Sequence, residues 1–373
     1  MDSLRRRLLQ AAILGGLSMQ AACDRNIGAQ LVPRRNSENG GRRRSVLILG
    51  GTGFVGPHVV NRAVDRGFEV TLFNRGRTNS SLFPDLELLI GDRARNLNAI
   101  QNEILSGRTW DAVIDLSGYE ADHVANTAGI LNVATAQYVF ISSVAAYASF
   151  REPNTETSAL HTSTTVGYGP QKAEAERRAA EAMPGRVTLL RPTFIAGPGD
   201  STDRLTYWPA RVARGGEMLV PGPMDRPIQF IDVRDVADFT LHCVENSLMG
   251  AFNAVIAARS YSMAQLLADC ESATEQDAAP VWVSPEFVED KGIDDEDQLP
   301  IWESPLGPRR AFPLISGQKS FEHGMVTRPP AETIRGTMAW WEELPEQRRR
   351  SMRAGLQAAR EEELLSEWRR LNA

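Results

Sequence analysis

The stretch VLILGGTGFVG at residues 46–56 decides the fold of this protein. Its first four residues are apolar and predict a short strand buried inside a parallel sheet. Glycines follow at once, and from Phe54 to Val64 the apolar residues return at helical spacing. A strand that leads through a glycine-rich turn into a helix is the setting in which such glycines bind the pyrophosphate of a dinucleotide. We therefore expect a nucleotide site at this turn.

Each residue of the turn has its own expected task. Gly50 permits the tight turn, Gly53 lets the pyrophosphate approach the backbone, and Gly56 permits close packing of the helix against the strand. Phe54 and Val55 begin the helix, whose free N–H groups and positive dipole end would face the phosphates. A glycine turn can also be purely structural, but the strand before it and the helix after it argue against that alternative.

A second apolar strand, residues 69–73, ends where NAD enzymes usually carry an acidic residue that binds the ribose 2′-hydroxyl. Here the strand is followed by Asn74, Arg75 and Arg77. No acid stands at this place to repel a 2′-phosphate, and two guanidinium groups could bind one. The sequence therefore favours NADP over NAD, with solvent-exposed turn arginines as the alternative.

Five more short apolar runs alternate with helical segments. They cover residues 86–90, 111–115, 137–141, 187–190 and 251–256. This alternation predicts an α/β fold with a doubly wound parallel sheet. The third strand is followed by Asp92 and Arg93, which we expect at the cofactor; Asp92 is placed to meet the adenine, or else it caps the next helix.

The fifth strand ends at Ser143, and Tyr168 and Lys172 follow at the start of a helical segment. Residues four apart lie on one face of a helix. An ammonium near a phenol favours the phenolate and lowers the pKa of the tyrosine, so that it can exchange protons near neutral pH. Ser143 could then hydrogen-bond a substrate oxygen whose charge changes during hydride transfer.

These motifs resemble those of the extended and atypical short-chain dehydrogenases/reductases, the NAD-dependent epimerase/dehydratase family. The resemblance rests on GGTGFVG at 50–56, YGPQK at 168–172, LLRPTFIAGPG at 189–199 and FIDVRDVA at 230–237, with VTLFNRGRT at 70–78 and DRLTYWPARVARGGE at 203–217 marking an atypical subgroup. It implies a Rossmann fold and a catalytic triad of Ser143, Tyr168 and Lys172, in which Lys172 also binds the nicotinamide ribose. It implies a small-molecule substrate with a sugar-like hydroxyl or carbonyl, and relatives that form dimers. The alternative is a non-catalytic sensor or scaffold, or an RNA-associated member.

The resemblance divides the chain into a Rossmann domain at 45–258 and a substrate lobe at 259–373, with 201–226 contributing to the lobe. Tyr207, Trp208 and Arg211 could line a site there for an anionic or sugar-like ligand, or could pack as a helix face. Tyr119 stands in a turn that is small and alanine-rich in many extended members. It could reach the nicotinamide or the substrate, or merely pack.

The N-terminus has the features of a targeting signal. Arg5, Arg6 and Arg7 precede an apolar stretch at 8–22, which is too short for an ordinary membrane span and resembles a twin-arginine export signal over 1–23. Cleavage near residue 22 would release an exported protein, whereas lipidation of Cys23 would anchor it to a membrane. Residues 24–44 read as a disordered linker. The expected location is therefore periplasmic or envelope-attached, with the cytoplasm as the alternative.

Charge is divided unevenly along the chain. The first 44 residues hold nine arginines and three acids, which leaves 32 basic and 44 acidic residues in the rest of the 373-residue chain. An acidic body argues against nucleic acid as a partner. The five histidines have no ligand spacing, so we expect no metal site. Three cysteines cannot build a disulfide framework, and Cys243 and Cys270 sit in apolar helical patterns typical of buried thiols.

Overall fold

The computed structural model describes residues 43–162, 167–276, 278–293 and 297–373. The predicted export signal, Cys23 and nearly all of the predicted linker lie outside these residues. The linker's last residue, Arg44, is described, and its carbonyl accepts a hydrogen bond of 2.8 Å from the Glu69 N–H at the start of a strand.

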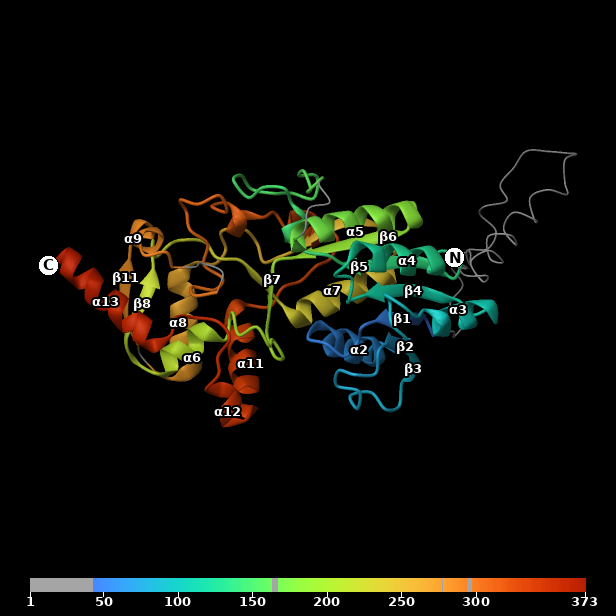
Figure 1. Ribbon diagram of the computed structural model, residues 1–373, viewed down its shortest axis with the longest axis horizontal. Coiled ribbons are helices and arrows are strands. Elements are labelled where there is room, and N and C mark those ends of the chain that lie inside the picture. The colour runs from blue at the N-terminus through green and yellow to red at the C-terminus, as the bar shows by residue number, and fades with distance from the viewer. Residues whose placement is uncertain (1–42, 163–166, 277, 294–296) are drawn as a thin grey trace, which may run out of the picture. The chain divides into compact units, whose positions relative to one another are not determined.

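Residues 45–254 contribute the strands of a seven-stranded sheet, in the order β10-β6-β5-β4-β1-β2-β3 (Figure 1). Every neighbouring pair in it is parallel. The strands are β1 Ser45–Leu49, β2 Glu69–Asn74, β3 Glu87–Ile90, β4 Trp110–Asp115, β5 Thr135–Ile141, β6 Val187–Pro192 and β10 Gly250–Ala254. This confirms the predicted doubly wound sheet. The strand order reverses between β1 and β4, the place where such sheets bind their ligands.

Helices cover both faces of the sheet (Figure 1). In β1, Val46 and Ile48 belong to the core under α2 (Val55–Asp65) and α7 (Val233–Asn246). Their neighbours Leu47 and Leu49 point to the opposite core, under α4 and α5. Successive strand residues point to opposite faces, so burial on both sides requires an unbroken apolar run. The helices of the second face are α3 Asn98–Leu105, α4 Ala121–Leu131 and α5 Tyr168–Ala182.

A separate hydrophobic core, apart from the two that flank the sheet, lies in the C-terminal part. Strand β8 (Gly216–Pro221) pairs in parallel with β11 (Ala278–Val283), and β7 (Phe194–Ala196) pairs with β9 (Phe230–Asp232). The helices of this part are α6 Tyr207–Ala213, α8 Met263–Thr274, α9 Pro285–Asp290, α10 Gln318–Glu322, α11 Pro330–Glu343, α12 Glu346–Arg349 and α13 Ala358–Asn372. Two short 3₁₀ turns, η1 Val144–Ala146 and η2 Phe312–Leu314, complete the elements.

The C-terminal segment differs from its prediction as one amphipathic helix over residues 345–373. It forms α12 and α13 with a break between them. Gly355 in this break has a φ of +98°, and a Cβ there would lie 1.9 Å from the ring of Tyr207. Any side chain at this position would clash with the Tyr207 ring, and the positive φ is not a helical value. The helix is therefore interrupted here, at a glycine.

Two sequence expectations about cysteines and membranes can be compared with the described residues. Cys243 and Cys270 are free and buried, as their apolar surroundings predicted. Among the residues that the structure describes, no helix is long and apolar enough to cross a membrane.

Candidate active site

The glycine turn after β1 has the shape that a dinucleotide needs. Gly50 and Gly51 have φ values of +111° and +39°, which other residues rarely adopt. A Cβ on Gly56 would lie 2.3 Å from the backbone carbon of Gly51, so the helix can pack this closely only with glycine there. A Cβ on Gly53 would meet nothing within 4 Å, which leaves its backbone open to a ligand.

Helix α2 begins directly after this open backbone. Its N-cap residue, Phe54, makes no side-chain capping hydrogen bond, so the first N–H groups of α2 remain available. These groups and the helix dipole favour a phosphate. The turn and the start of α2 therefore fit the pyrophosphate of a dinucleotide, in the arrangement that the sequence predicted.

A cavity of about 340 Å³ lies over the turn, at the carboxyl ends of β1, β2, β3 and β4. It is lined by Gly50, Thr52, Gly53, Phe73, Asn74, Arg75, Arg77, Thr78, Gly91, Asp92, Arg93, Ser117, Tyr119, Glu120 and His123. Most of the predicted cofactor residues thus border one space. The Asn74 side chain accepts a hydrogen bond of 2.7 Å from the Gly76 N–H and shapes the turn that carries Arg75 and Arg77. Both arginines are exposed, and neither forms an ion pair with a described residue.

Arg93 plays a different part from the one expected of it. Its guanidinium forms a two-pronged ion pair with Asp115, at 2.6 and 2.7 Å, and also donates to Thr127 at 2.7 Å. Asp115 is fully buried and accepts a further hydrogen bond of 2.6 Å from the Tyr138 hydroxyl. The guanidinium is therefore committed to the protein beneath the cavity, and Arg93 supports the floor of the site rather than offering a free charge to the nucleotide.

The three predicted catalytic residues lie together next to this cavity, although none of them lines it. The Ser143 hydroxyl accepts from the Ala145 N–H at 3.1 Å and is hydrogen-bonded to the Tyr168 hydroxyl. The Lys172 ammonium lies 5.7 Å from the centre of the Tyr168 ring. It also lies 5.3 Å from the ring of Tyr119, which lines the cofactor cavity, so the triad and the cavity adjoin.

Helix α5 can approach Ser143 because its second residue is Gly169. A Cβ at this position would lie 2.3 Å from the Ala145 carbonyl oxygen, in the turn that follows Ser143. No other residue allows this contact without a shift of the backbone. The glycine between Tyr168 and Lys172 thus fixes the distance between the phenol and the serine.

A buried network holds α5 from its far side, and the sequence analysis did not identify it. The Arg191 guanidinium on β6 binds Glu176 of α5 at 2.6 Å, and both side chains are buried. It also donates to the Tyr147 hydroxyl at 3.1 Å, and Tyr147 donates to Asn253 on β10 at 2.6 Å. Arg191 stands in a motif that carried the family resemblance, but only the packed strands show that it meets Tyr147.

The electrostatics of the triad differ from the sequence expectation. Tyr168 is 52% exposed, but the protein around it desolvates the phenol and raises its pKa, while Ser143 and the charge of Arg204 act against this rise. The Lys172 ammonium donates to the carbonyl oxygens of Gly118 and Ile141, at 2.9 and 3.0 Å. Burial lowers the pKa of Lys172 to about 8, with Asp115 opposing the shift. Before a cofactor binds, Lys172 is therefore held by the backbone rather than by the phenol.

The lowered pKa of Lys172 predicts a pH dependence of stability. In the folded protein the lysine loses its proton near pH 8, whereas in the unfolded chain it keeps the proton up to its ordinary pKa of 10.5. The unfolded state therefore binds more protons between these values, and the free energy of unfolding should rise with pH across this window. The rise should reach about 3 kcal/mol, since one pKa unit corresponds to about 1.4 kcal/mol.

Chemical denaturation of the wild type and of Lys172→Met between pH 7 and 10.5 measures this effect. The Met variant lacks the titrating group, so its free energy of unfolding should rise less across the window. Parallel curves for the two proteins would show that Lys172 is not the source of the pH dependence.

The predicted substrate residues of α6 need correction. Tyr207 and Trp208 are only 1% and 0% exposed and belong to the hydrophobic core of the C-terminal part. The indole of Trp208 donates to the Pro300 carbonyl at 2.7 Å. The aromatic face of α6 thus packs inward and cannot line a substrate site. Tyr119, in contrast, is 62% exposed beside Lys172, where it can meet a ligand.

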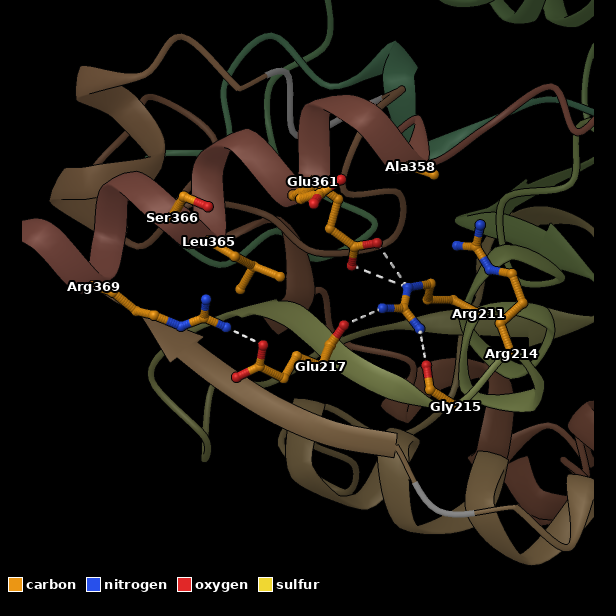
Figure 2. Close-up of a pocket in the computed structure, with 10 residues that line it drawn as sticks. Arg211, Arg214, Gly215, Glu217, Ala358, Glu361, Leu365, Ser366 and Arg369 are labelled. Carbon is orange, nitrogen blue, oxygen red and sulfur yellow. Dashed lines mark hydrogen bonds and ion pairs between the residues drawn. The ribbon is translucent and has the colours of Figure 1, made fainter.

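Arg211 is likewise engaged inside the protein, as Figure 2 shows. Its guanidinium pairs with Glu361 of α13 at 2.8 Å and donates to the Gly215 carbonyl at 3.0 Å and to the Glu217 carbonyl. A cavity of about 390 Å³ adjoins it, between α6 and α13, but Arg211 holds these elements together there. Its role is a structural one, because the guanidinium is buried and paired with the carboxylate of Glu361.

Arg204, four residues before Trp208, was not identified from the sequence. Its guanidinium carbon lies 5.4 Å from the centre of the Phe194 ring, and its charge acts on Tyr168. The aromatic residues of the same segment were more conspicuous, and nothing in the spacing marked this arginine.

Among the described residues there is no group of three or more side chains that could hold a metal ion.

The fold and the site define a Rossmann-type dinucleotide-binding protein with a serine, a tyrosine and a lysine beside the cofactor cavity. The family model for the NAD dependent epimerase/dehydratase family matches residues 46–254. The chain belongs to this family.

Individual relatives are more distant. The chain is 27% identical over 218 residues to the chloroplast stem-loop binding protein of 41 kDa b from Arabidopsis thaliana, covering 54% of this chain and 56% of that protein. It is 28% identical over 219 residues to the 2-alkyl-3-oxoalkanoate reductase of Stenotrophomonas maltophilia, covering 52% and 64%. The chain thus spans less than two thirds of the length of these curated relatives.

Solved structures show the same fold at lower identity. The Bordetella bronchiseptica enzyme WbmH, solved in complex with NAD+, superposes with a TM-score of 0.60 at 17% identity, covering 80% of this chain and 99% of that one. UDP-glucose 4-epimerase from Thermotoga maritima superposes with a TM-score of 0.59 at 18% identity, covering 80% and 99%.

Proposed function

We propose that this protein is a nicotinamide-dependent oxidoreductase or epimerase that acts on a hydroxyl or carbonyl of a sugar-like small molecule. The observation that carries the proposal is the cluster of Ser143, Tyr168 and Lys172 beside a cavity that fits a dinucleotide. The Lys172 ammonium lies 5.7 Å from the Tyr168 ring and 5.3 Å from the ring of Tyr119, which lines the cavity. Family membership and the UDP-glucose 4-epimerase relatives support a sugar-like substrate.

In the proposed mechanism, Tyr168 gives a proton to the substrate oxygen, or takes one from it, depending on the direction of the reaction. Ser143 holds the same oxygen, since its hydroxyl acts on the phenol of Tyr168. Lys172 places a positive charge beside the ring of Tyr168 and favours the phenolate that forms after proton transfer. When bound, the nicotinamide accepts or donates the hydride.

We propose NADP rather than NAD as the cofactor. Arg75 and Arg77 line the cavity, are exposed and have no ion-pair partner among the described residues. Two guanidinium groups suit a 2′-phosphate, which Arg binds with paired hydrogen bonds.

Replacing both arginines, as Arg75→Ala with Arg77→Ala, should weaken NADPH binding by about 10- to 100-fold, as expected for the loss of charge-assisted hydrogen bonds. NADH binding should change little, since NADH lacks the 2′-phosphate. Titrating nicotinamide fluorescence with wild type and variant gives both constants. An equal loss for the two nucleotides would contradict the assignment of NADP.

The acidic body of the chain gives no support to an RNA-binding role, although the chloroplast relative is named for stem-loop binding.

We propose that the protein is exported as a folded, cofactor-loaded enzyme, either cleaved near residue 22 or anchored at Cys23, and that it acts as a homodimer. Free NADP is not expected outside the cytoplasm. An exported enzyme would therefore have to bind its cofactor tightly and regenerate it within each turnover.

Mass spectrometry of protein purified from the envelope fraction tests this proposal. Under native conditions it reports the bound nucleotide and the oligomeric state, and under denaturing conditions the N-terminus. A chain that starts near residue 23 and carries NADP(H) is the expected result. A full-length chain without nucleotide would overturn both the export and the recycling of a tightly held cofactor.

A further inference from the structure

Arg204 is a half-buried cation at the edge of the catalytic cluster, in the segment between β7 and α6. Its guanidinium lies over the ring of Phe194. That ring packs against an apolar cluster that includes Val144, the residue after Ser143. Arg204 therefore contacts the aromatic ring that packs against the apolar cluster next to Ser143 in the chain.

The charge of Arg204 has no ion-pair partner among the described residues, although two carboxylates stand close to it in sequence. Asp203 pairs with Arg348 at 2.6 Å and accepts from the Arg353 N–H at 2.8 Å. Asp200 accepts from the backbone and hydroxyl of Thr202, at 2.8 and 2.7 Å. The second oxygen of Asp200 is buried and has no hydrogen-bond partner among the described residues. Neither acid forms an ion pair with Arg204, so the guanidinium keeps its donors for another group.

The backbone around Arg204 is fixed in an unusual conformation. Asp203 has a φ of +63°, a left-handed value that is strained for residues other than glycine and recurs at functional sites. Its contacts with Arg348 and Arg353 hold it there. At the other end of the segment, the His58 ring on α2 bonds to the Pro198 carbonyl at 2.9 Å. The segment is thus held at both ends, to the C-terminal part and to the cofactor helix.

We propose that Arg204 is a specificity-determining residue that binds an anionic group, a carboxylate or a phosphate, of the substrate beside its reacting carbon. A planar guanidinium over an aromatic ring presents paired donors that match either oxyanion. This inference rests on the proposed function, because it places the anionic group relative to the Tyr168 phenol. It narrows the substrate from a sugar-like molecule to an acidic one.

The test compares acids with matched neutral molecules on the full-length, NADP(H)-loaded protein. The probes are glucuronate against glucose for the carboxylate, and UMP against uridine for the phosphate, with dissociation constants from calorimetry at constant ionic strength. We expect wild type to prefer the acid of at least one pair, and that pair identifies the anion. Acids that bind no more tightly than their neutral counterparts in both pairs would overturn the inference.

The variants separate recognition from charge in general. Arg204→Met should weaken binding of the preferred acid by about 10- to 100-fold and leave its neutral counterpart unchanged, while Arg204→Lys should recover part of the loss. Arg214→Met, which removes an exposed cation of the same lobe, is the matched control and should bind like wild type. If both substitutions weaken binding of the acid equally, Arg204 contributes only to the overall electrostatic field of the protein and does not contact the anion.

Failure of the inference can be distinguished from failure of the proposed function. Nucleotide binding and Tyr168-dependent turnover test the enzyme itself, whereas acid preference is measured by binding alone. If the protein binds NADP(H) and shows Tyr168-dependent turnover, but Arg204→Met binds the acids as tightly as wild type does, the role of Arg204 is refuted and the proposed function stays intact.

Discussion

Replacing Tyr168 by phenylalanine should lower kcat/KM by about 10²- to 10⁴-fold, the range that proton transfer by a positioned side chain usually contributes. The variant removes only the hydroxyl that is hydrogen-bonded to Ser143. The ring remains, so α5 keeps its first turn and its close approach to the Ala145 carbonyl. Affinity for the nicotinamide nucleotide should be unchanged, since the glycine turn and the first turn of α2 lie apart from this hydroxyl.

Tyr119→Phe is the matched control for this experiment. Tyr119 is also an exposed tyrosine beside Lys172, with its ring 5.3 Å from the ammonium, but no hydrogen bond joins it to Ser143 among the described residues. Hydride transfer is followed by nicotinamide absorbance, and epimerisation by separation of product from substrate. Turnover that survives Tyr168→Phe at the wild-type rate would exclude the catalytic role and favour a protein that binds the cofactor without turnover.

Replacing Asp115 by asparagine should lower the free energy of unfolding by about 3–5 kcal/mol, the usual cost of breaking a buried ion pair. The carboxylate has no exposed surface and is the counter-ion of Arg93. It also accepts from Tyr138 and from the Ser117 N–H at 3.0 Å. The asparagine variant would leave Arg93 charged and buried without a counter-ion beneath the cofactor cavity.

The exposed pair Arg177–Glu181 of α5 provides the control, because its side chains are 55% and 60% exposed. Glu181→Gln should cause no measurable change, since exposed ion pairs are largely screened by water and salt. Urea unfolding of the three proteins gives the comparison, and nucleotide titration shows whether the cavity floor has moved. Equal stability of Asp115→Asn and Glu181→Gln would show that Arg93 does not depend on its partner.

The sequence alone predicted the parallel sheet and most of the cofactor cavity. Apolar strands and a glycine turn are local features, and their spacing along the chain is enough to specify them. Ser143, Tyr168 and Lys172 could also be named in advance, because the end of one strand and the start of one helix carry all three. Why Gly169 must be glycine became clear only when the Ala145 carbonyl was found beside it.

The roles that the sequence did not reveal belong to side chains whose partners are far away in sequence. Arg93 precedes its partner Asp115 by 22 residues, and Arg211 precedes Glu361 by 150. The sequence favoured a packing face for Tyr207 and Trp208 and left a ligand contact as the other reading, and the structure places both residues in the core of the C-terminal part.

The sequence by itself determined the class of fold and the chemistry available at the site, because strand burial, glycine conformation and helix spacing are properties of neighbouring residues. The tertiary structure decided which charges are free. Arg211 and Arg93 have buried carboxylates as counter-ions, whereas Arg204 forms no ion pair with a described residue, although Asp203 and Asp200 are close to it in sequence. An ion pair forms between groups that folding brings together, so the availability of an arginine for a substrate depends on the whole fold.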